Sequence, residues 1–307
     1  MNELNVIETT ELLPVALLDQ HRPLVEDLKR LARSLRLEFG WHYLLDLSWI
    51  LGRLKPGGLG GMRILEAGAG TGILQWYLAE QGAEVFSVDR MSRAALPLRF
   101  RRRFNVAGLR SSDLLPAGSA FWQGFNRPIH GGLPRRAAAT LAAQARDLAG
   151  YFSAAPAAGQ VWVYNQDLGR MDDIPDGSLD AVVSVSALEH NTPEGLESVV
   201  QEIMRKLKPG GLLLATLTAG KGQDSWHTPS AGWCYTDVTL RRLFHLPDSA
   251  ATNYDRYDEL FAQLRECAEL RDNLAGFYRD ANNKGMPGGV WDPQYQPVGV
   301  CKIKPIA

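Results

Sequence analysis

The chain has 307 residues, of which 45% are hydrophobic and 22% are charged, and its formal net charge is −1. This composition predicts a soluble globular protein with a sizeable core, and the near-neutral charge excludes a global basic field for nucleic acid. The three cysteines are far apart and odd in number, which argues against a disulfide framework and predicts a cytoplasmic protein. We find no signal pattern and no apolar run of membrane-spanning length, so we expect no membrane partner.

Two amphipathic helices are predicted ahead of the first strand. Residues 16–35 and 38–54 carry apolar side chains at helical spacing, and the second segment is rich in aromatic residues, including Trp41 and Trp49. Residues 55–58, Lys-Pro-Gly-Gly, then break the pattern.

A strand, a glycine turn and a helix follow at residues 63–81. The strand ends in Glu66, and three glycines then alternate with small residues: Gly68, Gly70 and Gly72. Residues without a Cβ let the backbone bend sharply and let a ligand lie against a helix N-terminus. Residues 84–88 are a second buried strand with Asp89 at its carboxyl end, where nucleotide-type folds hydrogen-bond a ribose diol.

The spacing of the glycines distinguishes two cofactors. A dinucleotide fingerprint needs a further glycine at position 73, which is Ile73. Residues 66–72, Glu-Ala-Gly-Ala-Gly-Thr-Gly, instead resemble the first motif of the class I S-adenosylmethionine-dependent methyltransferases of the small-molecule type. The resemblance implies S-adenosyl-L-methionine as cofactor and S-adenosyl-L-homocysteine as its product. It also implies that Glu66 anchors the amino-acid end, that Asp89 takes the ribose, and that Arg90 or Met91 covers an adenine face.

The resemblance further implies that the two N-terminal helices form a cap over the site. Ordinary core packing of Trp41 and Trp49 is the alternative. Residues 92–159 exceed the single helix that the fold needs between its second and third strands, so we predict an insertion there. It ends in an alanine-rich helix over 135–152. The insertion holds a cluster of six arginines that either bind an anionic acceptor or form a solvated face: Arg93, Arg99, Arg101, Arg102, Arg103 and Arg110.

Three more buried strands are predicted, at residues 161–164, 179–186 and 212–217, with a helix over 194–207. In the family that the chain resembles, an acid after the third strand meets the adenine amino group, which implies this role for Asp167. The resemblance also implies that Ser186 contributes through its backbone.

Two histidines are candidate proton acceptors. His190 belongs to a Leu-Glu-His segment after the fourth strand, as in many small-molecule methyltransferases, and His227 lies in the loop after the fifth. Methyl transfer from a sulfonium requires alignment and no metal, but a base of near-neutral pKa helps when the acceptor must lose a proton. A structural histidine is the alternative for each. His227, Cys234 and His245 match no zinc spacing, so we predict no metal.

Further helices are predicted over 237–244 and 254–278, and a last strand over 298–303. The whole pattern predicts an α/β, doubly wound Rossmann-like methyltransferase fold with a seven-stranded, mostly parallel sheet. We expect an N-terminal helical extension at 1–59 and a methyltransferase domain at 60–307. Its insertion between strands two and three spans about 92–159, and its acceptor-side loops are 221–235 and 282–297.

The predicted function is methyl transfer to a small-molecule acceptor, namely a hydroxyl of a secondary metabolite or of a sugar-containing compound. A nicotinamide-dependent oxidoreductase is an alternative that Ile73 disfavours. A non-catalytic scaffold is another, disfavoured by the intact set of cofactor residues. A nucleic-acid substrate is permitted by the arginines, but the net charge and the lack of a base-flipping motif count against it.

Overall fold

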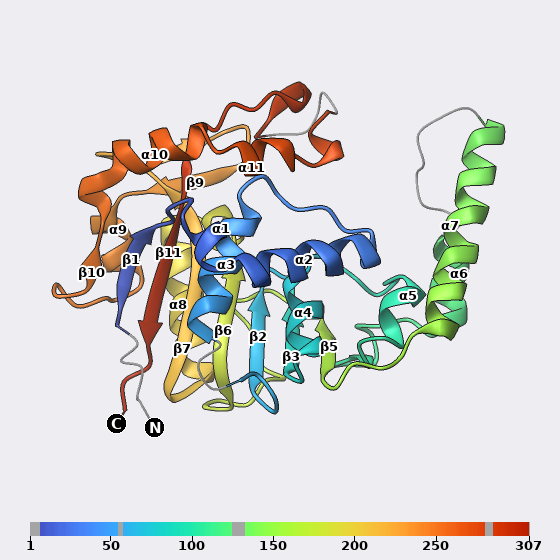
Figure 1. The fold of residues 1–307 in the computed structure, drawn as a ribbon. Coiled ribbons are helices and arrows are strands. Elements are labelled where there is room, and N and C mark those ends of the chain that lie inside the picture. Colours follow the sequence, from blue (N-terminus) through green and yellow to red (C-terminus); the bar gives the residue numbers. More distant parts are fainter. Residues whose placement is uncertain (1–6, 55–57, 125–132, 280–284, 307) are drawn as a thin grey trace. The chain divides into compact units, whose positions relative to one another are not determined.

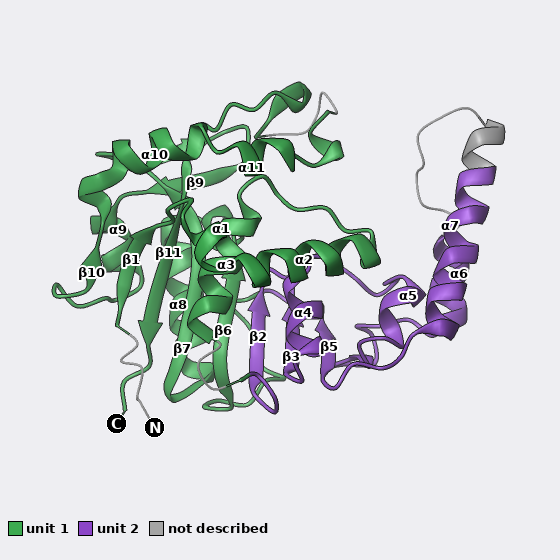
Figure 2. Cartoon of the chain, viewed as in Figure 1, with its two compact units in different colours: residues 1–58, 168–307 green, residues 59–167 purple. Residues whose placement is uncertain are grey.

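The computed structural model describes residues 7–54, 58–124, 133–279 and 285–306. The chain divides into two compact units, which Figure 2 distinguishes by colour: unit 1 comprises residues 1–58 and 168–307, and unit 2 comprises residues 59–167. The N-terminal helices thus group with the C-terminal half of the chain, whereas the sequence predicted a boundary at residues 59 and 60. The predicted domains stay a prediction. Parts of the predicted extension, insertion and second loop lie outside the described residues, namely 1–6, 55–57, 125–132 and 282–284.

Unit 2 is built on four parallel strands in the order β2, β3, β5, β4. They are β2 (Arg63–Ala67), β3 (Glu84–Val88), β4 (Val106–Gly108) and β5 (Gln160–Tyr164). Helix α4 (Leu74–Glu80) packs on β3 and β5. Short apolar runs such as that of β3 are buried almost completely, as expected for central parallel strands. The edge strand β4 lies inside the predicted insertion, where no strand was expected.

The remainder of the predicted insertion is mainly helical. It forms α5 (Leu98–Arg101), α6 (Ala117–Gly124) and α7 (Leu133–Ser153), and α7 packs against the other two. The alanine-rich helix that the sequence predicted is thus confirmed. Aromatic rings join α5 to α4: the ring of Trp76 lies 4.8 Å from that of Phe100 and 4.9 Å from that of Phe104. Stacked pairs of this kind contribute about 0.5–1.5 kcal/mol each beyond the area they bury.

Unit 1 contains a mixed sheet. Strand β6 (Leu179–Val185) is parallel to β7 (Leu207–Ala219), and β11 (Gln296–Ile303) runs antiparallel between β7 and β1 (Thr9–Leu12). The two-residue strand β10 (Ala251–Thr252) pairs with β1. Strand β7 begins five residues before the predicted start. Residues Lys208–Gly211, which were predicted to end the helix before the strand, form an irregular part of the strand itself. The register against β6 shifts there, from Leu179–Leu207 to Ala181–Leu212.

Helices cover both faces of this sheet (Figure 1). On one face α3 (Tyr43–Leu54) contacts β6, β7 and β11, with α1 (Leu17–Gln20) and α2 (Arg22–Leu35) beside it. The other face carries α8 (Pro193–Lys206) and α9 (Asp237–Leu243). Trp49 of α3 is fully buried against Gly299 of β11. Trp49 is therefore a core residue, as in the alternative that the sequence left open to a role in a cap over the site.

Two C-terminal predictions are wrong. The predicted loop 221–235 contains a hairpin of β8 (Ser225–His227) and β9 (Gly232–Tyr235), and β9 extends the sheet from β7. The single helix predicted over 254–278 is four short helices: η3 (Tyr254–Arg256), α10 (Tyr257–Arg265), α11 (Ala268–Asp272) and η4 (Gly276–Arg279). The short helices η2 (Leu188–His190) and η5 (Pro287–Gly289) complete the described elements.

The predicted fold class is confirmed, since both units are α/β and most strand pairs are parallel. The described residues form eleven strands rather than the predicted seven, and the sequence had located none of the short strands β1, β4, β8, β9 and β10. Among the described residues, no helix combines the length and apolarity needed to cross a bilayer.

Candidate functional site

The glycine turn of unit 2 is held against the end of β3. The amides of Gly68 and Ala69 both donate to the Val88 carbonyl, at 3.0 Å each. Gly68 and Gly70 have φ angles of +72° and +48°, a region that residues with a Cβ rarely adopt. The third glycine, Gly72, closes the turn by donating to the Ala69 carbonyl at 3.0 Å. The backbone therefore bends here because glycine permits it.

Asp89 lies beside this turn at the carboxyl end of β3. Its Oδ2 accepts from the Gly70 amide at 2.8 Å, and its Oδ1 accepts from the Met91 amide at 2.7 Å. Each carboxylate oxygen has about two acceptor positions, so each retains one for a ligand hydroxyl. The Asp89 amide donates to the Tyr164 carbonyl at 3.1 Å, which ties this residue to the end of β5 as well.

Glu66, the last acid before the turn, is 3% exposed. Its Oε2 is buried and finds no hydrogen-bond partner among the described residues. Burial raises the pKa of Glu66 to about 8, against the opposing effect of the Arg93 guanidinium. A buried carboxylate without a partner is costly and calls for a donor. The ammonium group of an amino-acid ligand would supply one, so these residues fit the predicted cofactor.

Two residues beneath the turn were not predicted to belong to the site. Gln75 Nε2 donates to the Gly72 carbonyl at 3.1 Å, and its Oε1 accepts from the Ser87 hydroxyl at 2.6 Å. Arg93 is 6% exposed and donates to the Gly70 carbonyl at 3.3 Å. The sequence singled out Arg93 only as one of six clustered arginines. Nothing in the local pattern distinguished it from the other five.

Those other five arginines bond to protein groups within unit 2 rather than to the turn. Their acceptors are Asp147 for Arg99, the carbonyls of Leu96, Ala94 and Leu115 for Arg101, the Phe152 carbonyl for Arg102, Glu80 for Arg103, and Asp113 for Arg110. These bonds favour a structural role for the five over the binding of an anionic acceptor.

The residues predicted near the adenine differ from the others in exposure. Arg90 and Asp167 are exposed, and the side chain of Met91 is 70% exposed. Asp167 follows the end of β5 by three residues and is the last residue of unit 2. Their predicted contacts with the adenine stay predictions.

Ser186, His190 and His227 belong to unit 1. Ser186 follows β6 directly and has a φ of +45°, a strained conformation for serine that costs on the order of 1–3 kcal/mol. Its amide donates to the Thr216 carbonyl at 3.0 Å, and its hydroxyl donates to Oε1 of Glu189. Glu189 is 1% exposed, and its Oε2 has no partner among the described residues. Burial raises the pKa of Glu189.

The two candidate bases differ in which ring nitrogen carries the proton. Nδ1 of His190 lies 2.8 Å from the Ala231 carbonyl, which can only accept, so Nδ1 carries the hydrogen and Nε2 keeps its lone pair. Nδ1 of His227 lies 2.8 Å from the Ser230 hydroxyl, which can donate or accept, and 3.3 Å from the Ser230 amide, which can only donate. With Nδ1 as the acceptor of that amide, the hydrogen of neutral His227 is on Nε2. Burial lowers the pKa of His227, which favours that neutral form. His190 is thus built to accept a proton at Nε2, and His227 to donate a hydrogen bond there.

A cluster of aromatic side chains adjoins His227 in unit 1. The Tyr295 ring lies 5.1 Å from that of His227, 5.2 Å from that of Trp41 and 5.8 Å from that of His42. His42 Nδ1 is 2.7 Å from Asp46 Oδ2, and both side chains are buried. This pair was not predicted, although the i, i+4 spacing of His and Asp on a helix is a pattern that the sequence contains.

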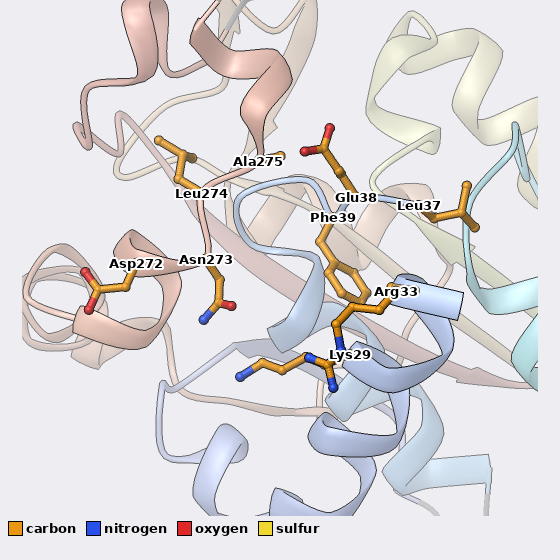
Figure 3. A pocket seen from close by; sticks show the side chains of 10 residues that line it. Lys29, Arg33, Leu37, Glu38, Phe39, Asp272, Asn273, Leu274 and Ala275 are labelled. Carbon is orange, nitrogen blue, oxygen red and sulfur yellow. The ribbon is translucent and has the colours of Figure 1, made fainter. Parts of the chain in front are cut away.

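Unit 1 also has an open cavity of about 310 Å³ between α2 and the segment after α11 (Figure 3). It is lined by Lys29, Ala32, Arg33, Leu37, Glu38, Phe39 and residues 272–275. None of the predicted site residues lines it. Across the described part of the chain, no group of three or more His, Cys, Asp or Glu side chains is arranged to hold a metal ion.

Comparison with solved structures gives similarities of low identity. The 4+2 cyclase SpnF is 16% identical, with a TM-score of 0.46 over 98% of this chain and 100% of that one. Phosphoethanolamine N-methyltransferase 2 of Haemonchus contortus is 18% identical, with a TM-score of 0.49, and the match covers 94% of this chain but 59% of that protein. A putative sarcosine dimethylglycine methyltransferase of Galdieria sulphuraria is 14% identical, with a TM-score of 0.45 over 84% of both chains. No curated protein matches the chain.

A family model described as a methyltransferase domain matches residues 137–215. The matched span runs from α7 through β5, β6 and α8 into β7, and so includes Asp167, Ser186 and His190. These are three of the residues that the sequence resemblance had placed at strand ends. The match assigns a methyltransferase domain to residues 137–215, a span that lies within the confirmed α/β fold.

Proposed function

We propose that this methyltransferase transfers a methyl group from S-adenosyl-L-methionine to a hydroxyl of a small molecule, such as a secondary metabolite or a sugar-containing compound. The observation that carries the proposal is the placement of Asp89. Its carboxylate is fixed at the end of β3 by the Gly70 amide, directly beside the glycine turn. A carboxylate in that place is suited to a ribose diol.

Three groups in unit 2 would hold the cofactor. The Glu66 carboxylate would take the ammonium of its amino-acid end, the turn at Gly68–Gly72 would lie against it, and Asp89 would accept from its ribose hydroxyls. The exposed side chains of Arg90 or Met91, and of Asp167, would contact the adenine. When bound, S-adenosyl-L-methionine supplies a methyl group on a sulfonium, whose transfer has a neutral leaving group.

Two histidines of unit 1 would bind the acceptor and take its proton. Nε2 of His190 would take the proton that a hydroxyl loses, and the hydrogen bond from Nδ1 to the Ala231 carbonyl keeps the ring in the tautomer for that task. Nε2–H of His227 would donate to the acceptor and orient it. The strain at Ser186 supports a functional role for the end of β6, because strained residues cluster at such sites.

Isothermal titration with S-adenosyl-L-homocysteine tests the cofactor. We expect the parent chain to bind it and Asp89→Ala to bind about 10- to 100-fold more weakly, since hydrogen bonds to a charged group contribute about 1.5–3 kcal/mol. Asp172→Ala is the matched control, because Asp172 is an exposed acid that pairs with the exposed Arg170. It should bind like the parent.

Failure of the parent to bind, or equal affinity of Asp89→Ala, contradicts the proposed cofactor site. Binding of NADH in place of S-adenosyl-L-homocysteine would revive the oxidoreductase reading. An acceptor screen with labelled methyl donor then tests the second half of the proposal. A product methylated on nitrogen or carbon would contradict the hydroxyl acceptor.

A further inference from the structure

Arg93 joins three elements of unit 2 beneath the glycine turn. Its Nη1 donates to the Gly70 carbonyl at 3.3 Å and to the Ser87 hydroxyl. Its Nη2 donates to the Ser87 carbonyl at 2.6 Å and to the Tyr164 carbonyl at 3.2 Å. The turn, the end of β3 and the end of β5 therefore meet on one buried guanidinium.

Three carboxylates act on the charge of the same guanidinium. Burial acts to lower the pKa of Arg93, while the charges of Asp89, Glu66 and Asp113 act to raise it. Burying a cation is costly unless negative charges and acceptors compensate for it. Asp113 is itself tied to Arg110 and to the Asn165 amide, so the carboxylates without an arginine of their own are Glu66 and Asp89. Arg93 is thus a cation whose charge interacts with both of the acids that are predicted to bind the cofactor.

We propose that Arg93 is a positioning residue of the cofactor site. Its fork fixes the Gly70 carbonyl relative to the ends of β3 and β5, and its positive charge acts on Glu66 and Asp89, the acids that would take the ammonium and the ribose of the cofactor. This inference rests on the proposed function, since it assumes that Glu66 and Asp89 bind that cofactor. Arg93 does not itself touch the ligand in this assignment.

Lysine cannot replace this arginine fully. A lysine ammonium carries the charge but lacks the planar fork that reaches two acceptors with each terminal nitrogen. Arg93→Lys should therefore separate the two contributions, because it keeps the charge and loses the geometry. Arg93→Met removes both while keeping much of the buried volume.

Arg101 provides a matched control. It is 8% exposed, lies in the same unit, and caps backbone carbonyls of Leu96, Ala94 and Leu115, but it has no contact with the turn. Arg101→Met therefore reports the general cost of removing a buried arginine. Its melting temperature should fall by a similar amount to that of Arg93→Met.

The test is titration with S-adenosyl-L-homocysteine between pH 6 and 8.5. We expect Arg93→Met to bind about 10- to 100-fold more weakly than the parent, Arg93→Lys to be intermediate, and Arg101→Met to bind like the parent. In the parent, affinity should rise as pH rises through the pKa of Glu66, because the charged carboxylate is the form that holds an ammonium. In Arg93→Met this rise should move to higher pH, whereas Arg93→Lys should keep the parental midpoint.

A merely structural arginine would lower stability without moving that midpoint. The charge of Asp89 also raises the pKa of Glu66, but Asp89 is the same in all four proteins, so its effect on the midpoint does not differ between them. If the parent does not bind S-adenosyl-L-homocysteine, the proposed function fails and this inference fails with it. If the parent binds and Arg93→Lys or Arg93→Met matches it in affinity and pH midpoint, only this inference is overturned. Should Arg93→Met not fold, the affinity of Arg93→Lys alone decides, since parental affinity there contradicts the role of the fork.

Discussion

The two histidines show how one hydrogen bond assigns different chemistry to the same side chain. His190 donates from Nδ1 to a carbonyl, and His227 accepts at Nδ1 from an amide. We therefore predict that ¹⁵N-detected long-range NMR spectra will show His190 as the Nδ1–H tautomer and His227 as the Nε2–H tautomer. His227 should titrate below its ordinary pKa of about 6.5, because burial disfavours the imidazolium. A His227 that titrates above that value, or that carries its hydrogen on Nδ1, would contradict this assignment.

The sequence predicted which residues lie at the site better than it predicted which residues they bond to. Glu66 lies near the end of the buried strand β2 and Asp89 directly follows β3, so the apolar runs were enough to set both acids at strand ends. Arg93 was indistinguishable from its neighbours, because its role depends on carbonyls of Gly70 and Tyr164 that are 23 and 71 residues away along the chain. Such contacts follow from strand order and register, which no local pattern encodes.

At the scale of elements, the packing of α3 on β11 is a sensitive contact. A Cβ at Gly299 would lie 2.4 Å from the Trp49 ring, so Gly299→Ala forces the ring or the strand to move. Overpacking of this kind costs about 1–3 kcal/mol, and we expect the melting temperature to fall by several degrees in calorimetry. Gly118→Ala in α6 is the control, because nothing lies within 4 Å of its added Cβ, and it should be neutral or slightly stabilising. Equal stability of the two variants would show that the contact is looser than the structure has it.

Elements with a strong local pattern were predicted well, and those made by tertiary pairing were not. The bounds of β3 match the prediction at both ends, since a buried run lies between Gly82 and Asp89. The segment 254–278 has helical periodicity, yet the chain leaves the helix at Cys267. Near that break the Arg265 carbonyl accepts from the Trp291 indole at 2.7 Å, a distant partner that replaces an intrahelical one. Strand β10 is two residues long and exists only because β1 lies beside it.

At the scale of the whole molecule, buried acids set the response to pH. Asp46 and Glu189 in unit 1 and Glu66 in unit 2 all have pKa values raised by burial. Each raised pKa means that the folded state binds a proton more tightly than the unfolded state does. The stability that these protons provide is fully present below the unfolded pKa and is lost as pH rises through the folded pKa. All three acids therefore act in the same direction.

The raised pKa of Glu66 predicts a measurable dependence of stability on pH. Its folded pKa of about 8 lies above the ordinary value of 4.5, so between these values the folded state holds a proton that the unfolded state has released. We expect the melting temperature of the parent to fall as pH rises from 6 to 8, and that of Glu66→Gln to fall less. One pKa unit corresponds to about 1.4 kcal/mol, so the difference between the two proteins should grow by up to about 2.7 kcal/mol over this range.

Glutamine is neutral in both states, which is why it removes the pH dependence of this site and keeps its shape. Glu266→Gln is the control, because Glu266 is exposed, and its melting temperature should follow the parent at every pH. Differential scanning calorimetry without ligand is the measurement. Parallel curves for the parent and Glu66→Gln would mean that Glu66 is already charged in the folded state, paired with Arg93 before any cofactor arrives. Diverging curves would mean that the protein keeps this acid protonated until a cation reaches it.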